Sequence, residues 1–139
     1  MIFYTDGSAH PNPGPGGFGV VIIDGDNNVK TYAEHFDHTT NNEMEMRAIV
    51  WASIYAIMKR DKDVTIYSDS AYAINTFTSW MFGWEKNNWI KSDGKVPENL
   101  ALVKAFYNLR NLANIKLVKV KGHANNEYNE LADKLATGV

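Results

Sequence analysis

The sequence predicts an α/β fold, a five-stranded mixed sheet flanked by helices, and two observations lead to it. Three β-prone segments follow one another near the amino terminus with short links, which is typical of an antiparallel meander. Two later β-prone segments each follow a helical pattern, so right-handed crossovers place them parallel to the first strand. With the strands numbered along the chain, we therefore expect the sheet order 3-2-1-4-5.

The first three strands are predicted at residues 2–5, 18–23 and 29–36. The loop between the first two is rich in Gly and Pro, and the sequence DGDNN after the second has the composition of a tight turn. We expect Asp6 at the carboxyl end of the first strand, beside a loop whose backbone can approach a ligand closely.

A long helix is predicted from Glu43 to about Lys59. Apolar side chains recur there at helical spacing, and Thr39, Thr40 and Asn41 supply capping side chains just before it. This helix is the expected crossover to the fourth strand, VTIYSD.

The remainder of the chain alternates helices with one more strand. Helical patterns at about 71–80 and 98–112 flank residues 80–97, which carry three Trp and no clean period. We expect that stretch to leave the compact body. IKLVKV alternates as the fifth strand, and a last helix follows the loop KGHANN.

Three acidic residues are expected to meet at one edge of the sheet. Asp6 follows the first strand and Asp69 follows the fourth, and these strands are neighbours where the mode of connection changes. Glu45 lies on one helical line with Ala48 and Ile49, so it should face the sheet near both Asp residues.

Carboxylates gathered in one pocket repel one another, and a divalent cation relieves that repulsion. Asp133 is a fourth candidate, in a helix where Asn126, Asn129 and Asp133 form a polar stripe, and His123 precedes that helix. The chain has no cysteine, so oxygen ligands favour Mg²⁺ or Mn²⁺ over zinc. Two such ions about 4 Å apart can activate a water and hold the leaving oxygen of a phosphodiester.

Taken singly, each of these residues has an ordinary structural explanation. An Asp after a strand is usually a turn or cap residue, and Glu45 in a first helical turn favours the helix dipole. Asp133 alone would be a solvated helix residue, and His123 a loop histidine. The prediction that three of these acids meet at one place favours a functional explanation over the ordinary structural ones.

Several motifs occur in order along the chain: YTDGS with NPGPGG, TTNNEMEM, YSDS, the spacing W-x3-W-x4-W, and VKGHA with an Asp ten residues after its His. With these, the chain resembles type 1 ribonuclease H along nearly its whole length, in the minimal form found in bacteria, archaea and phages. The resemblance implies a ribonuclease H-like fold, one domain over residues 1–139, and a Trp-rich handle at about 80–99. It also implies an endonuclease that hydrolyses the RNA strand of RNA/DNA hybrids, leaving 5′-phosphate and 3′-hydroxyl ends.

The same resemblance implies roles for the site residues. Asp6 would bridge two Mg²⁺ ions, with Mn²⁺ as a substitute, and Asp133 would complete the ion that activates water. Glu45 and Asp69 would hold the ion at the leaving 3′ oxygen, and His123 would assist proton transfer or product release.

The resemblance further implies a substrate surface made of three groups of residues. They are Asn12, Asn41 and Asn42 at the hybrid's minor groove, Thr40 and Asn99 at a DNA phosphate, and Trp80, Trp84 and Ser92 along the DNA strand. The handle has three Lys and three acids, so its charge is zero where many relatives are basic. We therefore expect weak hybrid affinity and a small salt dependence.

Two alternatives remain beside the nuclease. One is a binding module that keeps the fold without activity, although the full set of four acids speaks against it. The other is a transposase-like member of the same fold, which should lack the NNEME and GHA segments present here. With 139 residues, a net charge of −2 and no apolar run near the roughly 18 residues of a membrane span, we expect a cytoplasmic monomer without an obligate protein partner.

Overall fold

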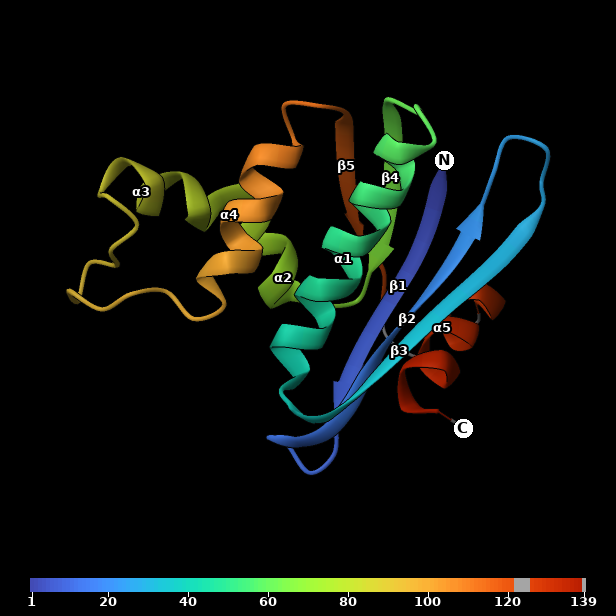
Figure 1. Ribbon diagram of the computed structural model, residues 1–139, viewed down its shortest axis with the longest axis horizontal. Coiled ribbons are helices and arrows are strands. Elements are labelled where there is room, and N and C mark those ends of the chain that lie inside the picture. The colour runs from blue at the N-terminus through green and yellow to red at the C-terminus, as the bar shows by residue number, and fades with distance from the viewer. Residues whose placement is uncertain (122–125, 139) are drawn as a thin grey trace.

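The computed structural model describes residues 1–121 and 126–138, and its centre is a mixed sheet (Figure 1). The sheet has five strands in the order β3-β2-β1-β4-β5. The strands are β1 (Ile2–Ala9), β2 (Gly14–Ile23), β3 (Val29–Thr39), β4 (Asp63–Ser68) and β5 (Asn114–Lys119). β1, β2 and β3 pair antiparallel, whereas β4 lies parallel to β1 and β5 parallel to β4. The predicted strand order and directions are confirmed.

The first two strands are longer than predicted. Residues expected in a Gly- and Pro-rich loop continue the ladder, in which Ser8 pairs with Gly17 and Ala9 with Gly16. Asp6 therefore lies within β1, and its placement at the strand's end was wrong. The long antiparallel pairing satisfies the backbone of a segment with low intrinsic β-propensity, so tertiary pairing overrides local preference.

Helices cover both faces of the sheet (Figure 1). On one face lie α1 (Asn41–Met58) and α4 (Leu100–Leu109), and on the other lies α5 (Glu127–Thr137). Between α1 and the sheet is a core of fully buried apolar side chains, which include Phe3, Phe18, Val20, Ile49 and Ile66. None of the helices in the described ranges has the length and apolar character of a membrane span.

The helix predicted at 71–80 differs in length and form. It consists of α2 (Ala71–Asn75), a wider π-helical segment η1 (Thr76–Trp80) and α3 (Met81–Lys86), so helix extends six residues into the expected excursion. Two hydroxyls bond carbonyls four residues earlier, Thr76 to Tyr72 at 2.8 Å and Thr78 to Ile74 at 2.6 Å. Such bonds compete with the helical ladder and favour a widened turn.

The handle packs against α4 through aromatic and cation–π contacts. The Trp89 ring meets Tyr107 edge-on with centroids 5.3 Å apart, and the Lys104 ammonium lies 5.6 Å from the Trp89 ring centre. The Arg110 guanidinium at the end of α4 lies 5.2 Å from the ring centre of Phe82 in α3. These contacts fix the handle to the helix that follows it.

Candidate metal and catalytic centre

Asp6, Glu45 and Asp69 come together as the topology predicts. Each offers a carboxylate oxygen, and these atoms lie within 4.8 Å of one another. The parallel pairing of β1 with β4 ends at Thr5 and Ser68. Asp6 and Asp69 are the residues that follow this last pair along the chain, which explains how two positions distant in sequence meet.

Glu45 reaches this cluster because α1 approaches β1 closely at Gly7. A Cβ at Gly7 would collide with the backbone of Met44 and Glu45. The Gly7 amide donates to the Asp6 carboxylate at 2.9 Å and also to the Glu45 carboxylate. One backbone group therefore holds both acids.

Asp133 arrives from the other face of the sheet. Gly19 of β2 pairs with Asp6, and a Cβ there would lie 2.6 Å from the carbonyl oxygen of Ala132 in α5. Because Gly19 has no side chain, α5 can lie close against the sheet at this point. The Asp133 side chain consequently faces a hollow of about 40 Å³. The hollow is lined by Asp6, Asp69, Asn129, Glu130 and Asp133.

Burial is the main cause of the pKa shifts of Asp6 and Glu45. Burial raises the pKa of Asp6 to about 6; a hydrogen bond with Glu45 opposes this rise, while the charge of Asp69 adds to it. Burial also raises the pKa of Glu45 well above its usual range, and Asp6 adds to that rise. Both shifts have the direction expected of buried carboxyl groups that lie close to other acids.

The donor set fits a divalent cation. Glu45 is 7% exposed, and its Oε2 has no hydrogen-bond partner within the described part of the chain. The ligands available are all oxygens, which suits Mg²⁺ or Mn²⁺. A volume of about 40 Å³ has room for a small ion and a few waters.

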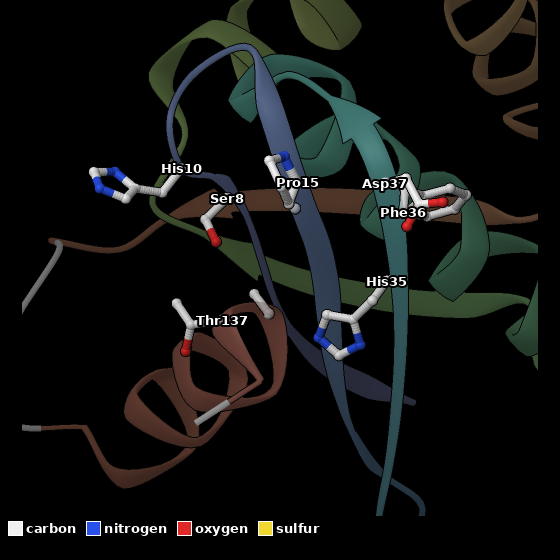
Figure 2. A pocket seen from close by; sticks show the side chains of 9 residues that line it. Ser8, His10, Pro15, His35, Phe36, Asp37 and Thr137 are labelled. Carbon is white, nitrogen blue, oxygen red and sulfur yellow. The ribbon is translucent and has the colours of Figure 1, made fainter.

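A larger hollow lies on the α5 side of the sheet and is a different site (Figure 2). Its volume is about 360 Å³, and its lining includes Ser8, His10, His35, Asp37 and Thr137. Among the described residues of that lining, Asp37 is the single carboxylate, so they do not provide the converging oxygen ligands of the smaller hollow. Chemistry, and not size, identifies the candidate centre.

The residues predicted at the minor groove form a connected network. The Asn41 side chain accepts from the Ala9 amide at 2.6 Å, and Asn12 accepts from the Asn41 amide at 3.1 Å. The Thr40 hydroxyl caps α1 by accepting from the Glu43 amide at 3.1 Å. This network ties the β1–β2 turn to the start of α1, where Asn42 is the second residue.

The residues predicted along the DNA strand also meet. Trp80, Trp84 and Ser92 line one hollow of about 420 Å³. Asn99 lies apart from it, with left-handed backbone before α4 and its amide 3.8 Å from the sulfur of Met46. The predicted His123 lies outside the described residues.

Sequence reasoning did not assign a role to Gly7, Gly19 or Asn129. The two glycines matter through close approaches between distant segments, and no local pattern signals such contacts. Asn129 had a signal, since it shares the polar stripe of Asp133.

Comparison with known proteins now places this geometry in a family. A family model described as RNase H matches residues 1–139. The chain belongs to the ribonuclease H family. It is therefore a nuclease, and the match favours ribonuclease H over the transposase-like alternative.

Relatives in the ribonuclease H family cover almost the whole chain. The Ribonuclease H of Thermoanaerobacter sp. (strain X514) is 43% identical over 135 residues, which are 96% of this chain and 85% of that protein. The Ribonuclease H of Acetivibrio thermocellus is 42% identical over 138 residues, 99% of this chain and 92% of that protein. The crystal structure of LC11-RNase H1 in complex with RNA/DNA hybrid superposes with a TM-score of 0.71 and 27% identity, over 97% of this chain and 92% of that one.

Proposed function

We propose that this protein is an endonuclease that hydrolyses the RNA strand of RNA/DNA hybrids with two divalent ions, leaving 5′-phosphate and 3′-hydroxyl ends. The observation that carries the proposal is the convergence of Asp6, Glu45 and Asp69, with oxygens within 4.8 Å, beside Asp133. The hybrid bound by LC11-RNase H1 supports the choice of substrate. The enzyme acts as a cytoplasmic monomer of one domain.

Each acid has a distinct place in this proposal. Asp6 groups with Glu45 and Asp69 and also lines the hollow with Asp133, so it would hold both ions. Asp133 would complete the ligands of one ion, and Glu45 and Asp69 would complete those of the other. Mg²⁺ held by these residues would lower the pKa of a bound water and stabilise charge on the leaving oxygen. His123 assists proton transfer or product release.

Substrate selection falls to two surfaces beside the acids. Asn12, Asn41 and Asn42 lie where the β1–β2 turn meets the start of α1, and their amides are suited to the 2′-hydroxyls of a hybrid's minor groove. The hollow at Trp80, Trp84 and Ser92 offers indole faces to the DNA strand, and Asn99 with Thr40 contacts a DNA phosphate.

The test uses four duplexes of one sequence: hybrid labelled on RNA, hybrid labelled on DNA, double-stranded RNA and double-stranded DNA. With Mg²⁺, we expect cutting of the RNA strand of the hybrid alone, and products that a ligase requiring 5′-phosphate can join. A single 2′-deoxy nucleotide at the cut site should sharply reduce cutting there. Equal cutting of double-stranded DNA would point to a general nuclease and refute the proposal.

A further inference from the structure

His35 of β3 joins the sheet to the carboxyl-terminal end of α5. Its ring Nε2 lies 3.0 Å from the carbonyl oxygen of Leu135, across 100 positions of the chain. A carbonyl oxygen only accepts, so the Nε2–H of the imidazole is the donor. The last four carbonyls of a helix lack partners within it, and this bond supplies one for Leu135. Figure 2 shows the His35 ring directed from β3 toward α5.

The part of β2 that lies under α5 carries no side chains at two positions. A Cβ at Gly17 would lie 2.9 Å from the Ala136 carbonyl oxygen, and one at Gly19 would lie 2.6 Å from that of Ala132. Helices usually find their register by packing ridges of side chains into grooves. Glycine under alanine offers few of either, so a directional hydrogen bond has more influence on where α5 lies along β2.

The same bond lies close to Asp133 along the helix. A Cβ at Gly17 would collide with the His35 ring, so the ring reaches α5 by passing over a residue without a side chain. Leu135 follows Asp133 by two residues, or about 3 Å of helix axis. The Thr137 hydroxyl donates to the Asp133 carbonyl at 3.1 Å within this last turn. A shift of the Leu135 carbonyl therefore also moves the Asp133 carboxylate.

We propose that His35 is a positioning residue of the hydrolytic site, which holds α5 in the register that brings the Asp133 carboxylate to the 40 Å³ hollow. The inference rests on the proposed function, in which Asp133 completes the ligands of one ion. Mg²⁺ demands nearly ideal ligand geometry, and a misplacement of about 1 Å can lower a rate as much as 100-fold. His35 acts through the helix, because it lines the larger hollow, whose described lining contains none of the four acids.

The experiment compares four full-length variants with the parent. His35→Ala removes the donor, and His35→Gln restores an N–H donor on a side chain of similar reach. Ile22→Val is the control for stability, because Ile22 is buried in the core between α1 and the sheet. His10→Ala removes the other histidine of the larger hollow. Each is measured for kcat and KM on the hybrid, for Tm in chelator, and for the rise in Tm that Mg²⁺ produces.

The loss of the His35 bond should affect kcat and the ion site together. His35→Ala lowers kcat about 10-fold with KM unchanged, and its Mg²⁺-induced rise in Tm is smaller than that of the parent. Its Tm in chelator falls by about 4 °C, the effect of one hydrogen bond in a chain of this size. His35→Gln recovers most of kcat. Ile22→Val loses a similar amount of Tm and keeps kcat, and His10→Ala keeps both kcat and the Mg²⁺-induced rise.

A double variant tests whether His35 acts through Asp133. Asp133→Ala removes the carboxylate that His35 positions. Adding His35→Ala to it should therefore reduce the Mg²⁺-induced rise in Tm no further, because the two changes affect one ligand. This comparison needs no turnover.

Three results would overturn the role of His35. The first is a kcat in His35→Ala no lower than in Ile22→Val, which would mean that the bond only stabilises the fold. The second is a KM that rises in both His35→Ala and His10→Ala while kcat is kept, which would mean that the larger hollow binds the hybrid. The third is a further loss of the Mg²⁺-induced rise in the double variant. Failure of the proposed function would be seen separately, as a parent protein that does not cut the hybrid, and the Mg²⁺-induced rise would still test the position of Asp133.

Discussion

The backbone amide of Gly7 donates a hydrogen bond to the carboxylate of Glu45, across 38 positions of the chain. The same amide serves Asp6 at 2.9 Å, so the first strand and the first helix are joined at the acid cluster. This contact requires a residue without a Cβ, because the backbones of Met44 and Glu45 occupy the space that a Cβ would need.

Gly7→Ala should therefore separate α1 from β1. We expect a loss of about 1 to 3 kcal/mol in the free energy of unfolding, the usual range for overpacking, and a weaker response to Mg²⁺. Gly25→Ala is the matched control, since nothing lies within 4 Å of a Cβ there. Urea unfolding of both variants in chelator gives the comparison. Equal stability of the two variants would contradict the close approach.

Stability without metal should fall as pH rises. Burial and like charge raise the pKa of Asp6 from 3.8 to about 6, so the folded state holds that proton more tightly than the unfolded state. The resulting stability is complete below pH 3.8 and is lost as pH rises through about 6. The loss is about 3 kcal/mol by the conversion of pKa shift into free energy. Burial of Glu45 acts in the same direction.

Urea unfolding in chelator between pH 4 and 7 measures this dependence, with Asp6→Asn as the reference. The variant has no carboxyl at this position, so its stability should change less with pH and exceed that of the parent at pH 7. If the free energies of unfolding of the two proteins changed with pH in parallel, folding would not raise the pKa of Asp6.

Divalent ions should stabilise the folded protein. An ion that binds the folded state alone raises stability by about 2.7 kcal/mol at a hundred times its Kd. We expect Mg²⁺ to raise the Tm of the parent and to leave that of Asp69→Asn nearly unchanged, because this variant loses a ligand and reduces the repulsion that the ion relieves. Differential scanning calorimetry with and without chelator decides it. If neither Mg²⁺ nor Mn²⁺ changes the Tm of the parent protein, this result would count against an ion site.

Binding to the hybrid should depend weakly on salt. Lys86, Lys91 and Lys95 are balanced by three acids in the handle, so few phosphates are neutralised there. Glu98→Lys changes an exposed handle residue and should steepen the slope of log K against log salt by about 1. Asp26→Lys makes the same change of charge in the β2–β3 turn, on the opposite side of the molecule from the handle (Figure 1), and should leave the slope unchanged. Identical slopes for the two variants would show that the handle does not contact the hybrid.

The strand order and the meeting of three acids were predictable from the sequence for a physical reason. Strand periodicity, helix caps and the handedness of crossovers are local or topological rules, and together they put Asp6 and Asp69 on adjacent strands. The helical spacing predicted that Glu45 faces the sheet, and its side chain is buried there.

Other features depend on contacts that no local pattern reveals. The ladder through Gly16 and Gly17 exists because β2 pairs with a strand that runs past Asp6. The widened turn at Thr76 reflects hydroxyl bonds that compete with the helix. Gly19 gains its importance only from how closely α5 packs against β2.

The central claim is that the acid cluster performs the cleavage. The direct measurement is the rate at which Asp6→Asn cuts the RNA strand of a hybrid in Mg²⁺, under conditions where unfolding curves show it fully folded. We expect the variant to be folded and to cut no faster than the parent protein does in chelator. A folded Asp6→Asn protein that cuts at close to the parent's rate would contradict the account.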